Sequence, residues 1–344
     1  MYDISRLLRP NIVHALDAAV EREQHSEPLR FDRNVSPFNA PLSRYPDAAD
    51  TALCQAVSRQ SGLRPDCIAV HHGVTEAVDI LLRLFCSPRE DNIVTTTPSR
   101  ALVRERAALA DVTCHEVPLD VAHDFGVSVE ALLSAADERT KLIFLCSPGS
   151  PSGVSLRAEV VLGLADAFDG LVVLDASYAD FSPRPSLYKE VAHHPNLVVL
   201  TALNSAWAAA ALTVGISFAV PEVTRLMRQV GLPHPISAVA AHEAERMLSR
   251  RTEVEQWVNV IREERARMMA AMAMLPFCDK VFPSETNFFL VRLRSADRIW
   301  RWLCSQGVRL HRPFSPLLAD CLRITIGSAA DNSRLLSLLR QIKG

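Results

Sequence analysis

Three side chains that can move protons stand just after apolar, strand-like segments: His72, Asp175 and Tyr178. Imidazole, carboxylate and phenol groups are common acids and bases in enzyme catalysis. Arg100 and Arg323 add guanidinium groups, which bind carboxylates and phosphates through paired hydrogen bonds. These residue types predict a site for a small molecule with a carboxylate or phosphate, and His72, Asp175 and Tyr178 are its candidate catalytic groups.

Each of these residues also has a structural alternative. Asp175 can cap the end of a strand, and Tyr178 can be a packed, hydrogen-bonded tyrosine. Arg100 can be a solvated arginine at a helix start. Arg323 alternates with Leu322 and Ile324, so its side chain is expected to face away from their apolar side, toward a ligand or toward an ion pair.

The elements that must position these residues alternate between short apolar runs and longer helical patterns. Continuous Val, Ile and Leu runs are typical of strands buried on both faces, as in a parallel sheet covered by helices. Such sheets bind ligands at the carboxyl ends of their strands. The predicted strands of this α/β fold lie at 67–73, 92–98, 141–148, 170–178, 196–203 and 213–220.

The domain organisation follows from the length of 344 residues and a change in texture near the C-terminus. We predict an N-terminal arm at 1–40, which contributes to the small domain, and a large domain at 41–245. A small α+β domain is expected at 246–344. One long helical stretch, roughly 236–275, is expected to join the two domains.

Composition excludes several classes of function. The net charge of −2 favours neither nucleic acid nor an anionic membrane, and no apolar run approaches the roughly 18–20 residues of a membrane span. The N-terminus lacks a signal-peptide pattern, so a cytoplasmic protein is expected. The eight cysteines contain no C-x-x-C pair and the histidines show no metal-binding spacing, so buried thiols and no metal are expected.

Five short motifs carry a resemblance to a known family, in the order SRYPD (43–47), FLCSPGSPSG (144–153), LDASYADFSP (174–183), PSETNFFLVR (283–292) and CLRITIGS (321–328). Together they resemble the fold-type-I aminotransferases that depend on pyridoxal phosphate, and most closely the histidinol-phosphate aminotransferases. The resemblance covers about residues 28–340. It implies the aspartate aminotransferase-like fold, with a large, mostly parallel sheet domain, a smaller C-terminal domain and a homodimer.

The family's catalytic lysine has no counterpart in this resemblance. In the family that lysine bonds covalently to the cofactor aldehyde and then moves the substrate proton. The family motif T-L-S-K-A-F-G-L-A-G-L-R-x-G aligns without gaps on residues 202–215. It places Ser205 at the lysine, Asn204 at the neighbouring serine and Thr213 at the phosphate-binding arginine. The chain has only four lysines, Lys141, Lys189, Lys280 and Lys343, and none is an obvious substitute.

Other cofactor contacts of the family differ as well. Val74 and Thr75 stand where the family has the serine and aspartate of its phosphate-binding G-S-D-E. Ser150 stands at the asparagine that contacts the ring hydroxyl, and Arg100 stands at the tyrosine that stacks on the ring. The resemblance therefore implies a cofactor site that has lost several of its binding groups.

Some family positions are retained. The resemblance implies that Asp175 faces the pyridine nitrogen and that Tyr178 reaches the ring hydroxyl. It implies that Tyr45 reaches toward the phosphate bound by the neighbouring subunit, with Asn34 in an N-terminal loop, and that Arg323 clamps a substrate carboxylate. These retained groups predict a pocket that still binds a ligand.

Several functions remain open from the sequence. The leading expectation is an aminotransferase-like protein that does not transaminate and takes no cofactor, with its pocket reused to bind or convert an amino-acid-like or phosphorylated carboxylate. A non-catalytic partner subunit is one alternative. The other is an enzyme that holds pyridoxal or pyridoxamine phosphate noncovalently for lysine-independent chemistry.

Overall fold

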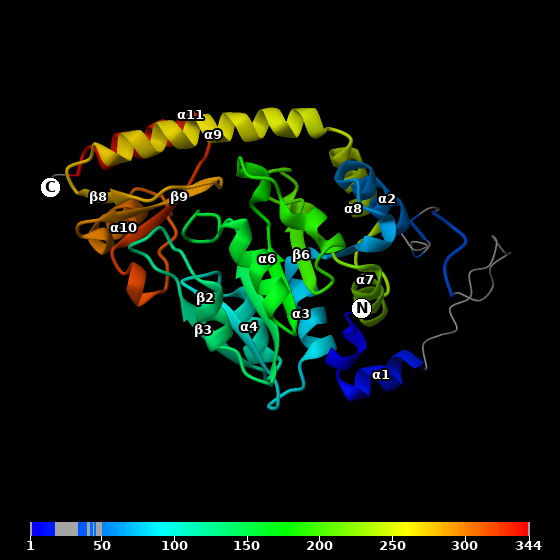
Figure 1. Ribbon diagram of the computed structural model, residues 1–344. Helices are drawn as coiled ribbons and strands as arrows, with labels where there is room; N and C mark the ends of the chain where they lie inside the picture. Colours follow the sequence, from blue (N-terminus) through cyan, green and yellow to red (C-terminus); the bar gives the residue numbers. More distant parts are fainter. Residues whose placement is uncertain (1, 18–33, 40–41, 44, 46–49, 343–344) are drawn as a thin grey trace.

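The core of the protein is a seven-stranded sheet with the order β1-β7-β6-β5-β4-β2-β3, seen in a computed structural model that describes residues 2–17, 34–39, 42–43, 45 and 50–342 (Figure 1). The pairings among β2 to β6 are parallel, whereas β7 runs antiparallel to β1 and β6. This confirms the predicted, mostly parallel sheet. The strands are β1 (Ile68–His72), β2 (Asn92–Thr97), β3 (Thr113–Pro118), β4 (Thr140–Cys146), β5 (Leu171–Asp175), β6 (Leu197–Ala202) and β7 (Val214–Phe218).

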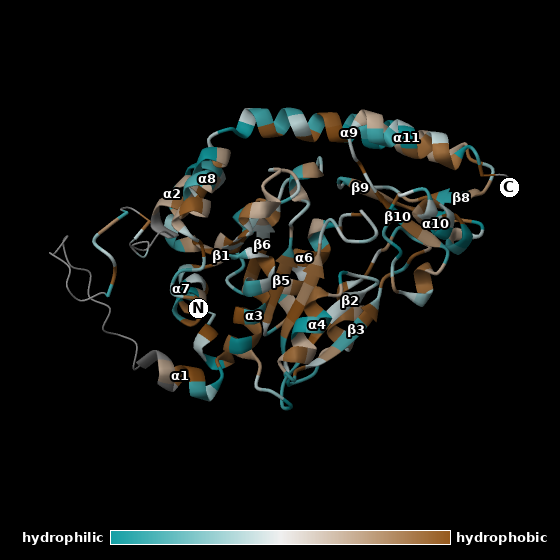
Figure 2. Ribbon diagram, turned by 180° about the vertical axis from the view of Figure 1, so that it is seen from behind, coloured by the Kyte–Doolittle hydropathy of each residue, from teal (hydrophilic) through white to brown (hydrophobic). Residues whose placement is uncertain are grey.

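Helices cover both faces of this sheet because successive strand residues point to opposite sides. In β6, Leu197 and Val199 belong to one apolar cluster and Val198 and Leu200 to another. Figure 2 shows the apolar ribbons of the central sheet enclosed by helices with polar outer surfaces. One face packs against α1 (Pro10–Asp17), α3 (Gly73–Phe85), α4 (Leu102–Leu109) and α7 (Pro221–Val230). The other packs against α2 (Asp50–Ser61), α5 (Val129–Ser134), α6 (Ala158–Ala167) and α8 (Ala238–Leu248).

A second, antiparallel sheet in the order β10-β9-β8 forms the small domain. Helix α9 (Arg251–Ala273) runs from the large sheet to this small one (Figure 1). Val254 and Val258 of α9 join the core of the large domain, and Met268 and Met272 join the core of the small one. The other elements are β8 (Cys278–Val281), β9 (Phe288–Leu293), β10 (Cys321–Thr325), α10 (Ala296–Ser305) and α11 (Ala329–Leu339).

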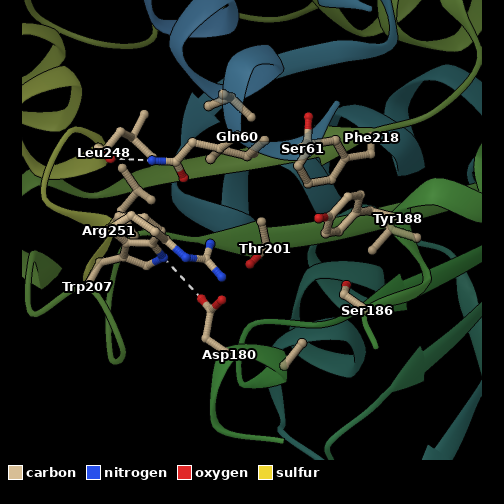
Figure 3. A pocket seen from close by; sticks show the side chains of 15 residues that line it. Gln60, Ser61, Asp180, Ser186, Tyr188, Thr201, Trp207, Phe218, Leu248 and Arg251 are labelled. Carbon is tan, nitrogen blue, oxygen red and sulfur yellow. Dashed lines mark hydrogen bonds between the residues drawn. The ribbon is translucent and has the colours of Figure 1, made fainter. Parts of the chain in front are cut away.

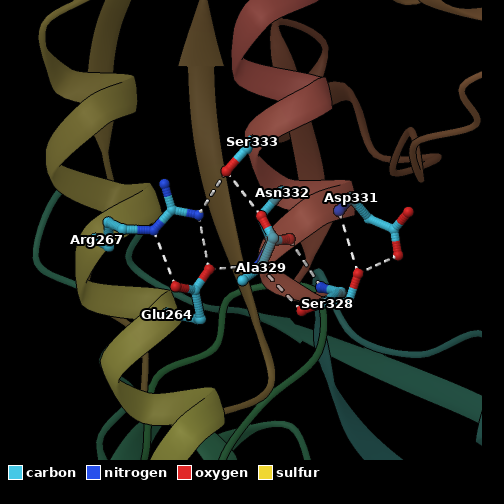
Figure 4. Close-up of polar contacts among 8 residues, drawn as sticks. Glu264, Arg267, Ser328, Ala329, Asp331, Asn332 and Ser333 are labelled. Carbon is cyan, nitrogen blue, oxygen red and sulfur yellow. Dashed lines mark hydrogen bonds and ion pairs between the residues drawn. The ribbon is translucent and has the colours of Figure 1, made fainter.

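A buried polar contact fixes α11 against α9 (Figure 4). The Asn332 amide donates to a Glu264 carboxylate oxygen at 2.9 Å and to the Gly327 carbonyl oxygen at 3.0 Å, and it accepts from the Gly327 backbone N–H. Asn332 is almost fully buried, and buried amides are stabilising only when such partners are present. Glu264 is also paired with Arg267 at 2.7 Å. This network helps to hold the long helix on the small domain.

The predicted single helix at 236–275 is wrong, because the structure breaks it into α8 and α9. Ser249 caps the end of α8, and its hydroxyl donates to the Arg246 carbonyl oxygen at 2.7 Å. A serine that satisfies a backbone carbonyl locally competes with continued helix hydrogen bonding. The turn at 249–250 redirects the chain, so that Arg251 begins α9 beside the large sheet.

Short 3-10 helices complete the described chain: η1 (Ile4–Leu7), η2 (Pro65–Cys67), η3 (Ala179–Phe181), η4 (Leu187–Ala192), η5 (Ala210–Leu212) and η6 (Pro316–Leu318). The predicted domain limits after residues 40 and 245 stay predictions. Much of the predicted N-terminal arm, at 18–33, lies outside the described residues. Within the described residues, no helix is both long and apolar enough to cross a membrane.

Candidate functional site

Several of the predicted site residues lie at the carboxyl ends of the central strands. Asp175 ends β5, and Tyr178 follows it by one turn. Asn204 and Ser205 come directly after β6. These strands are neighbours and parallel, so their ends meet at one edge of the sheet. The functional role of these residues stays a prediction, but the structure does bring the ends of β5 and β6 to one edge of the sheet.

Arg100 contacts Asp175 directly. Its Nη1 lies 3.2 Å from Asp175 Oδ2, and Asp175 Oδ1 accepts hydrogen bonds from the backbone N–H and the hydroxyl of Ser177. Burial works against the Arg100 charge, but the combined effects of Asp175, Tyr178 and Cys146 outweigh it and raise the pKa of Arg100. Arg100 is thus neither a solvated helix-start residue nor an isolated cation.

Tyr178 lies near Arg100, and its phenol makes no hydrogen bond with the described residues. Its ring packs edge-on against Phe288, with ring centroids 5.1 Å apart. Burial raises the pKa of Tyr178, while Arg100 acts in the opposite direction. The hydroxyl is therefore a neutral group that can donate to or accept from a ligand.

Arg323 reaches the site from the small domain, on strand β10. Its Nη1 donates to the Ser150 hydroxyl at 2.9 Å, and its guanidinium stacks over the Phe288 ring at 4.8 Å. Its Nε is buried without a hydrogen-bond partner among the described residues. Burial lowers the pKa of Arg323, and the nearby Arg100 adds to this effect. A guanidinium with an unpartnered buried donor is suited to bind a ligand anion.

A pocket of about 420 Å³ opens between Arg100 and Arg323. Sequence analysis missed three of its lining residues, Arg104, His311 and Phe314. The spacing from Arg100 to Arg104 is one helical turn, a signal that was available in the sequence. His311 pairs with Arg323 through the backbone, and Phe314 is 99% exposed beside the pocket. The wall carries three arginines and one glutamate, Glu105, so it favours an anionic ligand.

The residues that resemble a phosphate cradle also come together. Gly215 lies so close to the start of α3 that an added Cβ would stand 2.4 Å from the Gly73 carbonyl carbon. Thr213 has a left-handed backbone conformation and lies beside Gly73. The helix start presents the backbone amides of residues 73–75, and such a terminus attracts anions. Val74 is buried there and Thr75 is exposed.

His72 precedes this helix start as its N-cap. Its backbone N–H donates to the Glu76 carboxylate, while its side chain is exposed and makes no hydrogen bond with the described residues. The pocket between Arg100 and Arg323 does not include it. A catalytic role for His72 therefore stays a prediction with no geometric support.

Ser205 and Asn204 occupy the turn between β6 and β7. Asn204 has a buried side-chain oxygen without a partner among the described residues, which is an unsatisfied hydrogen-bonding group beside Ser205. Among the described lysines, Lys141 pairs with Asp91 at 3.5 Å and Lys280 with Asp124 at 3.8 Å.

No described lysine lines the pocket. Lys189 is exposed in η4, and Lys343 lies outside the described residues.

Asn34 and Tyr45 lie apart from Arg100 and Arg323. Together with residues 237–239 they line a separate pocket of about 440 Å³, and Tyr45 stacks on His234 with ring centroids 5.3 Å apart. Tyr45 is 59% exposed. The two residues do not contribute to the candidate site of their own chain, and their ligand-binding role stays a prediction.

No group of three potential metal ligands occurs in the described part of the chain.

A large sheet with the candidate site at its strand ends, joined to a small sheet domain by α9, defines an aspartate aminotransferase-like fold. A family model described as aminotransferase class I and II matches residues 17–342, so the chain belongs to that family. It is 34% identical over 345 residues to a histidinol-phosphate aminotransferase of Bacteroides fragilis, covering 99% of both chains. A histidinol-phosphate aminotransferase of Parabacteroides distasonis is 35% identical over 346 residues and is covered completely.

Solved structures agree on the fold. A histidinol-phosphate aminotransferase from Sinorhizobium meliloti, in complex with pyridoxal-5'-phosphate, superposes with a TM-score of 0.80. It is 20% identical, and the match covers 99% of this chain and 90% of that one. The enzyme of the same name from Clostridium acetobutylicum gives a TM-score of 0.79 at 20% identity, covering 87% of this chain and 90% of that one.

The expectation that the protein takes no cofactor is therefore wrong. The family match, together with a structure of this fold solved with pyridoxal-5'-phosphate, points to that cofactor. The inference from Ser205 and the other altered positions went too far because several further binding groups are retained. The helix start at Gly73, the carboxylate of Asp175 and the phenol of Tyr178 are all present.

Proposed function

We propose that this member of the aminotransferase family binds pyridoxal or pyridoxamine phosphate noncovalently and acts on a small amino-acid-like substrate. Ser205 takes the lysine position, so the reaction is not ordinary lysine-dependent transamination. The observation that carries the proposal is the group formed by Arg100, Asp175, Tyr178 and Arg323, with no described lysine in the pocket. The protein is thus an enzyme whose cofactor contacts are all noncovalent.

The chain's own residues fit such a cofactor. The amides at the start of α3 suit its phosphate, and Gly215 keeps that start free of a side chain. Asp175 suits the pyridine nitrogen, whereas Tyr178 and the unsatisfied Asn204 suit polar ring substituents. When bound, the cofactor supplies an electron sink for a substrate carbon. Without a lysine, Tyr178 is the nearest candidate to hold or move a proton.

The pocket between the arginines suits a substrate with a carboxylate and a second anionic group. Arg323 provides a buried, unpartnered Nε for the carboxylate. Arg104 and His311 line the rest of the pocket. Burial and the neighbouring Arg323 lower the pKa of His311, so it is a neutral partner near pH 7. The relatives are named for histidinol phosphate, which supports a phosphorylated amino compound as another class of substrate for this pocket.

Replacing the carboxylate clamp is expected to weaken substrate binding. Arg323→Gln should weaken binding of a carboxylate ligand such as glutamate about 10- to 100-fold, because a charge-assisted hydrogen bond contributes about 1.5–3 kcal/mol. Isothermal titration calorimetry of both proteins, each saturated with pyridoxamine phosphate, measures the change. Arg225→Gln, on the exposed face of α7, is the matched control. Equal affinities for Arg323→Gln and the parent protein would show that the clamp is not used.

We further propose that the protein works as a homodimer. Exposed apolar residues lie in the pocket of Asn34 and Tyr45 and in the segments next to it, and Tyr45 stacks there on His234. A second copy that covers them would remove apolar surface from water. The exposed residues are Phe38, Leu42, Leu232 and Val239. Sedimentation equilibrium tests the assembly, and a monomer at micromolar concentration would contradict it.

A further inference from the structure

A second pocket lies on the α2, α8 and α9 side of the large sheet (Figure 3). Its volume is about 80 Å³, enough for a molecule of a few heavy atoms. It continues into a wider pocket of about 450 Å³ that shares Asp180, Ser186, Tyr188 and Arg251 with it. Neither pocket shares a lining residue with the one between Arg100 and Arg323.

Asp180 supplies one charge to this second pocket. Its Oδ2 accepts a hydrogen bond from Trp207 Nε1 at 3.0 Å, and its other carboxylate oxygen has no hydrogen-bond partner among the described residues. Burial raises the pKa of Asp180, because nearby cations compensate its negative charge only in part. A cationic group of a ligand would stabilise the buried negative charge of Asp180.

Arg251 supplies the opposite charge. Its Nε is paired with Glu255 at 2.8 Å, which leaves both terminal nitrogens without a hydrogen bond to the described residues. The guanidinium lies over the ring of Trp207 at 5.7 Å and points into the pocket (Figure 3). No ion pair joins it to Asp180 within the described chain, although the two charges influence each other. The pocket thus offers a donor group and an acceptor group at separate positions.

Hydroxyl groups and apolar side chains form the remaining wall. Thr201, Ser186 and Tyr188 direct hydroxyls to this region, and none of the three makes a side-chain hydrogen bond with the described residues. Polar groups in such a place are normally satisfied by water or by a ligand. The apolar part consists of Val57, Val199, Leu203, Ile216, Phe218 and Leu248.

We propose that this pocket binds a small apolar α-amino acid as its zwitterion. The carboxylate pairs with the terminal nitrogens of Arg251, the ammonium group pairs with Asp180, and the side chain contacts the apolar wall. A ligand with only a carboxylate would leave Asp180 without a cationic partner, and one with only an amine would leave the terminal nitrogens of Arg251 without an acceptor. Charge complementarity therefore favours a molecule that carries both groups.

The position of the pocket connects it to the candidate active site through the chain. Asp180 follows Tyr178 by two residues, and Trp207 follows Ser205 by two. The hydrogen bond between Asp180 and Trp207 already ties the two loops together. A ligand bound to Asp180 would act on both loops, so the pocket is placed to sense an amino acid separately from the substrate.

Titration with L-valine tests the proposal. Isothermal titration calorimetry of the full-length protein should show saturable binding, together with a change in tryptophan fluorescence that Trp207→Phe removes. 3-Methylbutanoate lacks only the ammonium group and isobutylamine lacks only the carboxylate, so each should bind at least about tenfold more weakly than L-valine. Because these ligands are compared on the unmodified protein, the result does not depend on whether a variant folds.

Variants assign the binding to this pocket. Arg251→Gln and Asp180→Asn should each weaken L-valine binding about tenfold or more. Arg250→Gln is the matched control, because Arg250 pairs with Glu253 on the same helix and does not line the pocket. Binding that survives Arg251→Gln, or binding lost in Arg323→Gln instead, would overturn the proposal. Absence of saturable binding would overturn it as well.

Discussion

Ser205→Lys is expected to convert noncovalent cofactor binding into covalent binding. A lysine amine at this position can bond to the cofactor aldehyde, which serine cannot do. After incubation with pyridoxal phosphate and borohydride reduction, the variant should gain the mass of one reduced cofactor at residue 205. Peptide mass spectrometry locates the attachment, and the parent protein should show none at this residue.

The control for this substitution is Ser205→Arg, which adds a similar cation without an amine that reacts with aldehydes at neutral pH. It should bind the cofactor reversibly and gain no mass on reduction. If Ser205→Lys folds, as judged by its thermal unfolding, yet stays unmodified at residue 205, Ser205 does not face the cofactor. The alignment that places it at the lysine position would then be wrong.

Arg100→Tyr is expected to tighten cofactor binding by about tenfold. The ion pair between Arg100 and Asp175 occupies the carboxylate that suits the pyridine nitrogen, at a distance of 3.2 Å. Removing the arginine frees that carboxylate. The new tyrosine also offers a ring face, and aromatic stacking contributes about 0.5–1.5 kcal/mol beyond the buried area. Fluorescence titration with pyridoxamine phosphate measures the dissociation constant of each protein.

Arg104→Tyr is the matched control because Arg104 lies one helical turn further along and pairs with Glu116 at 3.1 Å. It should leave the cofactor affinity unchanged within about twofold. Weaker binding in Arg100→Tyr would contradict the expectation. It would mean that Arg100 contacts the cofactor itself, for example through the phosphate, and the assignment of Asp175 to the pyridine nitrogen would fail.

Six of the seven strands of the large sheet could be predicted because burial on both faces leaves a continuous apolar run in the sequence. The edge strand β3 was missed because most of its residues are not buried, so it has no such run. Arg323 could be predicted to face a polar region, because strand residues alternate and its neighbours Leu322 and Ile324 are apolar. The structure places its guanidinium in the candidate site beside Ser150. The pattern of apolar residues along the chain was enough to predict these strands and the direction of the Arg323 side chain.

Contacts between distant segments could not be predicted in this way. Arg100 and Asp175 are separated by 75 residues, and nothing local to either residue shows that they form an ion pair. The pocket of Asp180 and Arg251 depends on where α9 begins, and the helix break before it was missed. The expectation of no cofactor rested on Ser205 and on other altered positions such as Val74 and Thr213, although binding depends on many contacts that only the fold brings together.

Reductive trapping of the unmodified protein tests most directly whether the cofactor is held without a lysine. The protein is saturated with pyridoxal phosphate, divided, treated or not treated with borohydride, and then denatured for intact-mass and peptide analysis. We predict saturable binding at one cofactor per chain that denaturation releases in both samples. A stoichiometric adduct on Lys141, Lys189, Lys280 or Lys343 would contradict the proposal, and so would the absence of saturable binding.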